Sequence, residues 1–254
     1  MPDLHDTAPE NHAPPAFDAL LPPQMATRAE AIGVAKAGLP LLTTAALAVL
    51  AGAFIALGAN FYTVATTGSE LGFGPTRVLG GAAFSLGLLL VVVGGAELFT
   101  GNNLIVMAWA DRRITTLALL RNWAVVYAGN FAGAIGTAAI VYLSEQWAFG
   151  GDRVGENALR IANNKVQLGF TEAVALGVLC NALVCLAVWL SFSARSTIDR
   201  AIAVFFPITA FVAAGFEHSI ANMYFIPLGL FLKHEDAVTG LDTMAGADLS
   251  SLTW

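Results

Sequence analysis

Charged residues are scarce in this sequence: Asp, Glu, Lys and Arg make up 12% of its 254 residues, whereas 57% are hydrophobic. Soluble domains carry about a quarter charged residues, so this composition indicates a protein whose solvent is lipid. The sequence also has no Gly-rich phosphate loop, no Cys and His set with metal-ligand spacing and no Ser nucleophile motif. It therefore predicts no enzyme, no metal site and no cofactor. Without a basic patch among aromatics, it predicts no nucleic-acid partner either.

Cysteine and histidine are equally rare. Cys180 and Cys185 share an apolar stretch, where we interpret them as packing residues rather than as a disulfide or metal pair. Of the four histidines only His218 lies in a long apolar stretch, whereas a redox-enzyme anchor subunit with a bis-histidine haem needs two at membrane depth. That anchor subunit remains the alternative from another functional class. A water or glycerol channel is disfavoured, because the Asn-Pro-Ala tripeptides expected of one are absent.

Long stretches with little or no charge dominate what is present. A helix crosses the roughly 30 Å hydrocarbon core of a bilayer with about 20 apolar residues. Five stretches exceed that length, and they lie between Lys36 and Glu70, Arg77 and Asp111, Arg121 and Glu145, Glu172 and Arg195, and Arg200 and Lys233. The sequence therefore predicts an all-α membrane protein with five spans.

The segments outside the spans suggest how the chain is organised. Residues 1–24 are rich in proline and acid and lack the pattern of a signal peptide, which predicts a disordered N-terminal tail. Residues 25–36 alternate charge with apolar residues at helical spacing, as expected of a helix on the membrane surface, and residues 25–254 form one transmembrane channel domain. A cytoplasmic N-terminus would put seven of the 12 Lys and Arg residues inside, which favours this orientation for a multi-pass protein of the cell (inner) membrane.

The second and fifth stretches are longer than one crossing requires and carry polar residues in their middle. They read GAELFTGNN from Gly95 and GFEHSIAN from Gly215, with a glutamate two residues after the glycine and an asparagine five residues after that glutamate. Because the two copies lie three spans apart, they run in opposite directions through the bilayer. The sequence therefore predicts an inverted repeat with broken second and fifth spans, a design that places a binding site near the midplane.

The residue types at the breaks suggest separate roles. We interpret Glu97 and Glu217 as structural, because an ionised carboxylate would repel an anion, whereas one bonded to the unpaired N–H groups of a broken helix is stabilising. A functional role for these glutamates stays open. His218 is interpreted as functional, because an ionisable side chain within a span faces a cavity more often than lipid.

The segments GAELFTGN and GFEHSIANM resemble the paired signature segments of the formate/nitrite transporter family, and LCNALVCLAVWLSFSARS is most like its formate-channel branch. The resemblance covers Met25 to Trp254. It implies an aquaporin-like protomer of six spans, a homopentamer with one pore per subunit, and transport of a small monovalent anion. Formate is the expected anion, with nitrite or hydrosulfide as the alternative. The sixth span of the family is absent from this sequence, so we expect a C-terminal truncation.

The resemblance also implies pore residues. The central histidine of the family falls on His218, the threonine that hydrogen-bonds near it on Thr100, the pore asparagine on Asn181 and the basic residue of the outer vestibule on Lys165. We expect Asn222 to belong to the pore as well. The apolar constrictions fall on Leu98, Phe99 and Val184 toward one face and on Phe84, Leu88 and Phe211 toward the other. Without the resemblance the latter three would be ordinary core residues.

These residues suggest a mechanism. Lys165 and the positive half-helix ends attract the anion, apolar rings exclude bare ions, and His218, held by Thr100, lends a proton at the midplane. Protons are therefore expected as a second partner, with the lipid bilayer as the third.

Overall fold

The computed structural model of the chain describes residues 19–244 and 247–253. Within these residues every regular element is a helix, which confirms the all-α fold. The predicted N-terminal tail falls mainly on residues 1–18, outside the described part.

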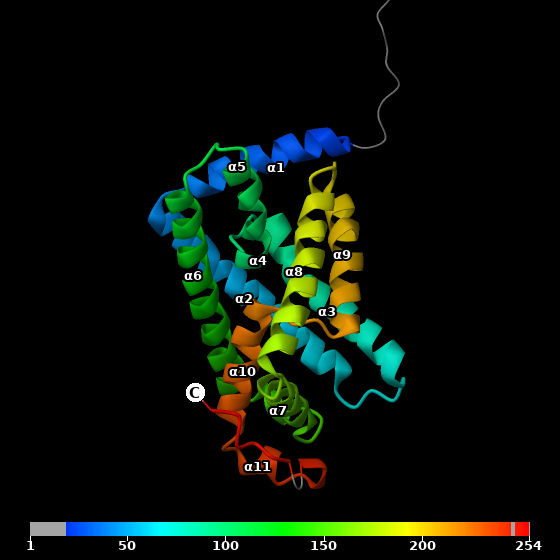
Figure 1. Cartoon of the computed structure of the whole chain (residues 1–254). Helices are drawn as coiled ribbons and strands as arrows, with labels where there is room; N and C mark the ends of the chain where they lie inside the picture. The colour runs from blue at the N-terminus through cyan, green and yellow to red at the C-terminus, as the bar shows by residue number, and fades with distance from the viewer. Residues whose placement is uncertain (1–18, 245–246, 254) are drawn as a thin grey trace, which may run out of the picture.

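Helix α1 (Pro22–Ala37) crosses one end of the bundle, at the top of Figure 1. Its buried residues Met25, Ala29, Gly33 and Ala37 follow one another at intervals of four, so a single face packs on the bundle. The helix begins three residues earlier than the predicted Met25. A proline at the first helical position is preorganised for helix, and the Gln24 side chain accepts a hydrogen bond from the Leu21 backbone N–H at 2.8 Å.

Five helices of the described part are long and apolar enough to cross a membrane, one in each predicted stretch. They are α2 (Leu41–Thr66), α3 (Phe73–Gly94), α6 (Thr116–Leu143), α8 (Phe170–Ser191) and α9 (Thr197–Ala214). In Figure 1, α6, α8 and α9 stand upright while α2 and α3 cross behind them. Large apolar side chains such as Leu42, Leu117 and Phe170 are exposed on the outside of the bundle, as expected where lipid replaces water.

Both predicted breaks are present. Helix α3 ends at Gly94, and the chain resumes as α4 (Phe99–Asn102), the 3₁₀ turn η1 (Asn103–Ile105) and α5 (Val106–Ala110). Helix α9 ends at Ala214, and α10 (Ser219–Leu232) follows. Gly95 and Gly215 cap the two ended helices with φ of 73° and 82°, a conformation that favours glycine. The confirmed inverted repeat thus rests on one glycine cap in each half.

Helices α2 and α6 approach until their backbones touch. A Cβ atom on Gly52 would lie 2.1 Å from the backbone oxygen of Asn130, and one on Gly133 would lie 2.0 Å from that of Val49. Small residues that permit such approach are the usual means of joining helices in a bilayer, where hydrophobic association is weak.

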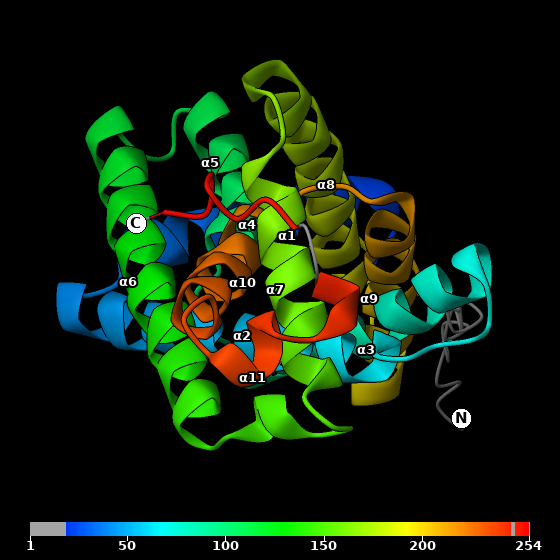
Figure 2. The same cartoon turned by 90° about the horizontal axis from the view of Figure 1, so that it is seen from below.

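The end of the bundle opposite α1 is covered by an amphipathic helix that the sequence analysis did not predict, α7 (Arg153–Val166). Figure 2, viewed from below, shows α7 and the short α11 (Asp236–Thr239) lying across this end. The turns η2 (Gln146–Ala148) and η3 (Asp242–Met244) complete the described elements. Helices α1 and α7 are counterparts in the two halves, because one precedes α2 and the other precedes α8.

Candidate functional site

The two breaks meet at Thr100 and His218. The hydroxyl oxygen of Thr100, in the first turn of α4, lies 3.1 Å from Nε2 of His218, the N-cap residue of α10. Both residues are buried, with 3% and 4% exposure. The pair therefore joins the two halves of the repeat at the centre of the bundle.

The hydrogen bonds of His218 assign the proton of its neutral ring. Nδ1 accepts a hydrogen bond from the backbone N–H of Ala221 at 3.0 Å, so Nδ1 carries no proton. The proton of the neutral imidazole is then on Nε2, which donates to the Thr100 hydroxyl. A proton on Nδ1 would break this N-cap bond of α10. The protonation state of the ring is therefore coupled to the capping of the helix.

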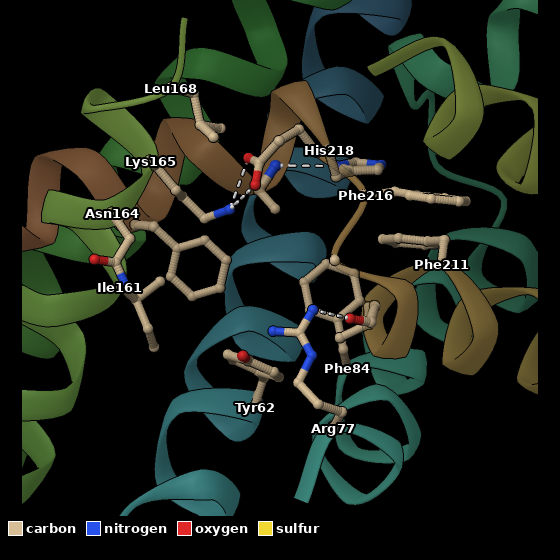
Figure 3. Close-up of a pocket in the computed structure, with 15 residues that line it drawn as sticks. Tyr62, Arg77, Phe84, Ile161, Asn164, Lys165, Leu168, Phe211, Phe216 and His218 are labelled. Atoms are coloured by element: carbon tan, nitrogen blue, oxygen red, sulfur yellow. Dashed lines mark hydrogen bonds and ion pairs between the residues drawn. The ribbon is translucent and has the colours of Figure 1, made fainter. Parts of the chain in front are cut away.

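Two phenylalanine rings enclose the imidazole on one side. Phe211 stacks on it with ring centres 5.8 Å apart at 17°, and Phe84 meets it edge-on at 6.2 Å. The two phenylalanines also touch each other at 5.7 Å. Figure 3 shows both rings beside His218. The sequence-predicted residues Phe84, Phe211 and His218 are thus brought together.

Two cavities flank this centre. The α7-side cavity, about 210 Å³, is lined by residues that include Tyr62, Arg77, Phe84, Lys165, Phe211, Glu217, His218 and Phe225 (Figure 3). The α1-side cavity, about 300 Å³, is lined by residues that include Arg28, Lys36, Leu88, Val91, Gly95, Glu97, Leu98 and Arg200. Each cavity therefore combines apolar side chains with arginine and a lysine–glutamate pair.

One expected constriction residue, Leu88, lies on the other side of the centre, and two others line neither cavity. Leu88 lines the α1-side cavity together with Leu98, not the α7-side cavity of Phe84 and Phe211. Phe99 lines neither cavity and packs on Tyr127. Val184 is fully buried in the core and lines neither cavity. The constriction role of Phe99 and Val184 therefore stays a prediction from the resemblance.

The predicted pore asparagine, Asn181, also lines neither cavity. Its Oδ1 accepts a hydrogen bond from Nδ2 of Asn103 at 3.2 Å, and its amide lies 3.6 Å from Cys185 Sγ. The Cys185 thiol in turn donates to the backbone oxygen of Thr100 at 3.5 Å. Asn181 therefore connects α8 to the second-span break through polar contacts behind Thr100.

A lysine–glutamate–asparagine cluster stands at the second-span break. Lys36 of α1 lies 2.6 Å from a Glu97 carboxylate oxygen and 3.0 Å from Asn102 Oδ1, and Asn102 Nδ2 donates to the other Glu97 oxygen at 2.7 Å. Lys36 was not predicted as part of the site. A signal existed, since Lys36 lies in the last turn of α1 as Lys165 lies in the last turn of α7.

The fifth-span break holds the equivalent cluster. Lys165 donates to both Glu217 carboxylate oxygens at 2.7 and 3.0 Å, and Asn222 Nδ2 donates to Glu217 at 2.8 Å. Asn222 faces Glu217 and lines neither cavity. Both glutamates are thus tied to lysine and asparagine side chains, not to the unpaired backbone groups that the sequence analysis expected.

Asn130 of α6 satisfies the backbone of the second-span break instead. Its amide donates to the oxygens of Ala48 and Glu97 at 2.8 and 2.9 Å, and its own oxygen accepts from the Phe99 N–H at 2.9 Å. This fully buried residue was not singled out from sequence, because a lone asparagine inside an apolar span does not show which distant backbone it serves.

Comparison with known proteins identifies the family. Residues 23–253 match the family model described as formate/nitrite transporter. The chain belongs to the formate/nitrite transporter family.

Similar proteins of this family span most of the chain. The "Formate channel FocA" of Escherichia coli (strain K12) is 48% identical over 218 residues, which cover 85% of this chain and 76% of that protein. The "Formate channel FocA" of Haemophilus influenzae is 43% identical and covers 78% and 72% of the two chains. A solved structure described as "Pentameric formate channel with formate bound" is 40% identical, with a TM-score of 0.73 and 84% coverage of both chains.

Membership of the formate/nitrite transporter family decides between the functional classes. Its members are channels and transporters, so the predicted non-enzymatic role is confirmed and the redox-enzyme anchor loses its support. In the part of the chain that the structure describes, no three His, Cys, Asp or Glu residues cluster in a way that could hold a metal ion.

Proposed function

We propose that this protein passes formate across the cell (inner) membrane, along a path from the α7-side cavity past the Thr100–His218 pair to the α1-side cavity. The observation that carries the proposal is the contact of Thr100 and His218 at 3.1 Å between two cavities lined with basic residues. Similar proteins are formate channels by name, and one solved relative is described with formate bound, which favours formate over nitrite or hydrosulfide.

The apolar side chains of the path explain why an ion does not leak through it. Phe84 and Phe211 border the α7-side cavity, and Leu88 and Leu98 border the α1-side cavity. Moving a bare carboxylate past such side chains costs several kcal/mol, whereas a neutral acid crosses at far lower cost. Passage therefore benefits from a proton on formate at the centre.

His218 is the group placed to supply that proton. Protonation of the ring replaces the bond that Nδ1 accepts from the Ala221 N–H, and release of the proton restores that bond. Transfer of one proton from the imidazolium to formate leaves a neutral ring and formic acid; formic acid releases the proton on the exit side, and a proton taken up from the solution on the entry side recharges the ring. Thr100 keeps the ring oriented through Nε2. Formate and a proton then move together.

The orientation and assembly belong to the same proposal. A cytoplasmic N-terminus puts α1 on the inner side and α7 on the outer side, in agreement with the excess of Lys and Arg in the inner segments. A homopentamer with one path per subunit is supported by the pentameric solved relative and by the exposed apolar faces of the bundle.

Transport assays of the full-length protein test the function. Proteoliposomes are mixed with formate, nitrite, acetate or hydrosulfide in a stopped-flow instrument, and the change in internal pH or anion content is followed. We expect formate to enter fastest and empty liposomes to show only slow leakage. A protein that conducts none of these anions would overturn the proposed function.

A further inference from the structure

Each lysine at a break is paired with a glutamate, so the pair as a whole brings no net charge to the path. Lys36 lies 2.6 Å from Glu97, and Lys165 lies 2.7 Å from Glu217. An anion several ångströms away meets each pair as a dipole, whose attraction is far weaker than that of a free cation. Neither lysine by itself therefore explains why an anion would collect at the entrance.

Arg77 supplies an uncompensated positive charge in the α7-side cavity. Within the described residues no carboxylate lies within ion-pair distance of its guanidinium. Nε donates to the Ala213 oxygen at 3.1 Å and Nη2 to the Val212 oxygen at 2.8 Å, whereas Nη1 makes no hydrogen bond within the described residues. Figure 3 shows the guanidinium entering the cavity beside Tyr62.

The carbonyls that Arg77 binds make its position significant. They belong to the last turn of α9, whose C-terminal end at the break carries a partial negative charge and would repel an arriving anion. By covering these oxygens the guanidinium removes that repulsion and replaces it with attraction. The arginine therefore converts the end of the half-helix into an anion-accepting surface.

Arg200 is the counterpart of Arg77 in the α1-side cavity. Helices α3 and α9 pack against each other, Arg77 lies near the start of α3, and Arg200 lies near the start of α9. Arg200 lines the α1-side cavity with Gly95 and Ala96, which directly follow α3, and no carboxylate of the described part lies within ion-pair distance of it. The inverted repeat thus places one arginine in the cavity next to each helix break.

We propose that Arg77 and Arg200 capture the anion at the two ends of the path, whereas Lys36 and Lys165 hold the breaks in shape. This inference rests on the proposed function. Arg28 of α1 also lines the α1-side cavity but is exposed to solvent, so it adds to the attraction there without facing the break.

Substitution by glutamine separates charge from hydrogen bonding, because the amide keeps an N–H donor. In proteoliposomes, Arg77→Gln and Arg200→Gln are each expected to raise the half-saturation concentration for formate roughly five- to tenfold with little change in the maximal rate. At 1 M salt, where the Debye length is about 3 Å, the difference from the wild type should largely vanish. Arg77→Lys should keep near-normal half-saturation.

Arg121→Gln is the matched control. Arg121 also donates to a backbone oxygen, that of Leu39, but lines neither cavity, so its loss should leave the half-saturation unchanged. If Arg77→Gln lowers the maximal rate at every salt concentration and also lowers the melting temperature, Arg77 acts only as a structural cap of α9, and the inference is wrong. If the wild-type protein transports formate and both arginine variants keep its half-saturation concentration, the inference is wrong while the proposed function stands. A wild-type protein without anion transport would overturn it together with the proposed function.

Discussion

The hydroxyl of Thr100 and Nε2 of His218 lie 3.1 Å apart although 118 residues separate them in the chain. Each residue follows a glycine-capped helix end in its own half of the inverted repeat. Their hydrogen bond is thus the point at which two distant breaks become one site, and the following predictions depend on it or on the groups around it.

Replacing His218 by asparagine tests the proton step. Asparagine is a good N-cap residue and can keep the bond to the Ala221 N–H, but it does not titrate near neutral pH. We expect His218→Asn to fold normally and to lose the pH dependence of formate flux, measured in proteoliposomes between about pH 5 and pH 8. His218→Phe, which lacks the cap, serves as the destabilised comparison. An unchanged pH profile in His218→Asn would show that the ring does not carry the proton.

Replacing Thr100 by valine removes the partner of His218 Nε2 with little change of shape. A buried donor left without an acceptor costs about 1–3 kcal/mol, and the ring loses its orientation, so we expect formate flux to fall by roughly tenfold. Thr100→Ser keeps the hydroxyl and should retain most of the flux. Equal losses in the two variants would mean that packing of the methyl group, not the hydrogen bond, is what matters.

Breaking the Lys36–Glu97 pair should be costly. Glu97→Gln leaves the Lys36 ammonium without its carboxylate. The Lys36 side chain is 27% exposed and that of Glu97 is 4% exposed, so the loss should exceed the about 0–1 kcal/mol of a surface pair and stay below the about 3–5 kcal/mol of a fully buried one. Thermal unfolding in detergent measures the loss. Replacing both residues, as Lys36→Met with Glu97→Leu, should recover part of it.

Glu156→Gln is the control for that experiment. Glu156 pairs with Arg160, whose side chain is 50% exposed, and such surface pairs contribute about 0–1 kcal/mol. A melting temperature that falls equally in Glu97→Gln and Glu156→Gln would contradict a structural role for the pair at the break.

The left-handed backbone favours glycine at both breaks, and Gly215 is restricted further by its contact with Arg77. At Gly95, with φ of 73°, a Cβ atom meets nothing within 4 Å, so Gly95→Ala should cost only the roughly 1–2 kcal/mol of left-handed backbone. At Gly215 a Cβ atom would also lie 2.8 Å from Arg77 Nη2, so Gly215→Ala should raise the half-saturation for formate as well. Unfolding and uptake assays separate the two effects.

Gly136→Ala is the matched control for these substitutions. This glycine lies inside α6 with ordinary helical backbone, and a Cβ atom there meets nothing within 4 Å. Alanine in a helix interior is favoured by about 0.5–1 kcal/mol over glycine, so the melting temperature should stay the same or rise. A fall as large as that of Gly95→Ala would refute the argument from the left-handed cap.

Local features of the sequence determined the spans, the breaks and the family. The number and places of the spans follow from charge-free runs, because each helix must satisfy its own backbone hydrogen bonds in lipid. The repeated Gly-x-Glu pattern with its later asparagine, at Gly95 and Gly215, predicted both breaks, since a glycine cap and a polar residue inside an apolar run are visible without knowing the fold. Helix α7 escaped prediction because its charges resemble those of a solvated loop.

Only the tertiary structure decided which side chains face one another. Lys36 pairs with Glu97, 61 residues away in the chain. Asn130 donates to the backbone oxygens of Ala48 and Glu97, to which no sequence pattern links it. The same applies to Leu88, whose helical position allowed either cavity, and to Arg77, whose carbonyl partners lie on α9. Hydropathy and periodicity report the environment of a single segment, whereas a hydrogen bond or ion pair between distant segments depends on how the whole bundle packs.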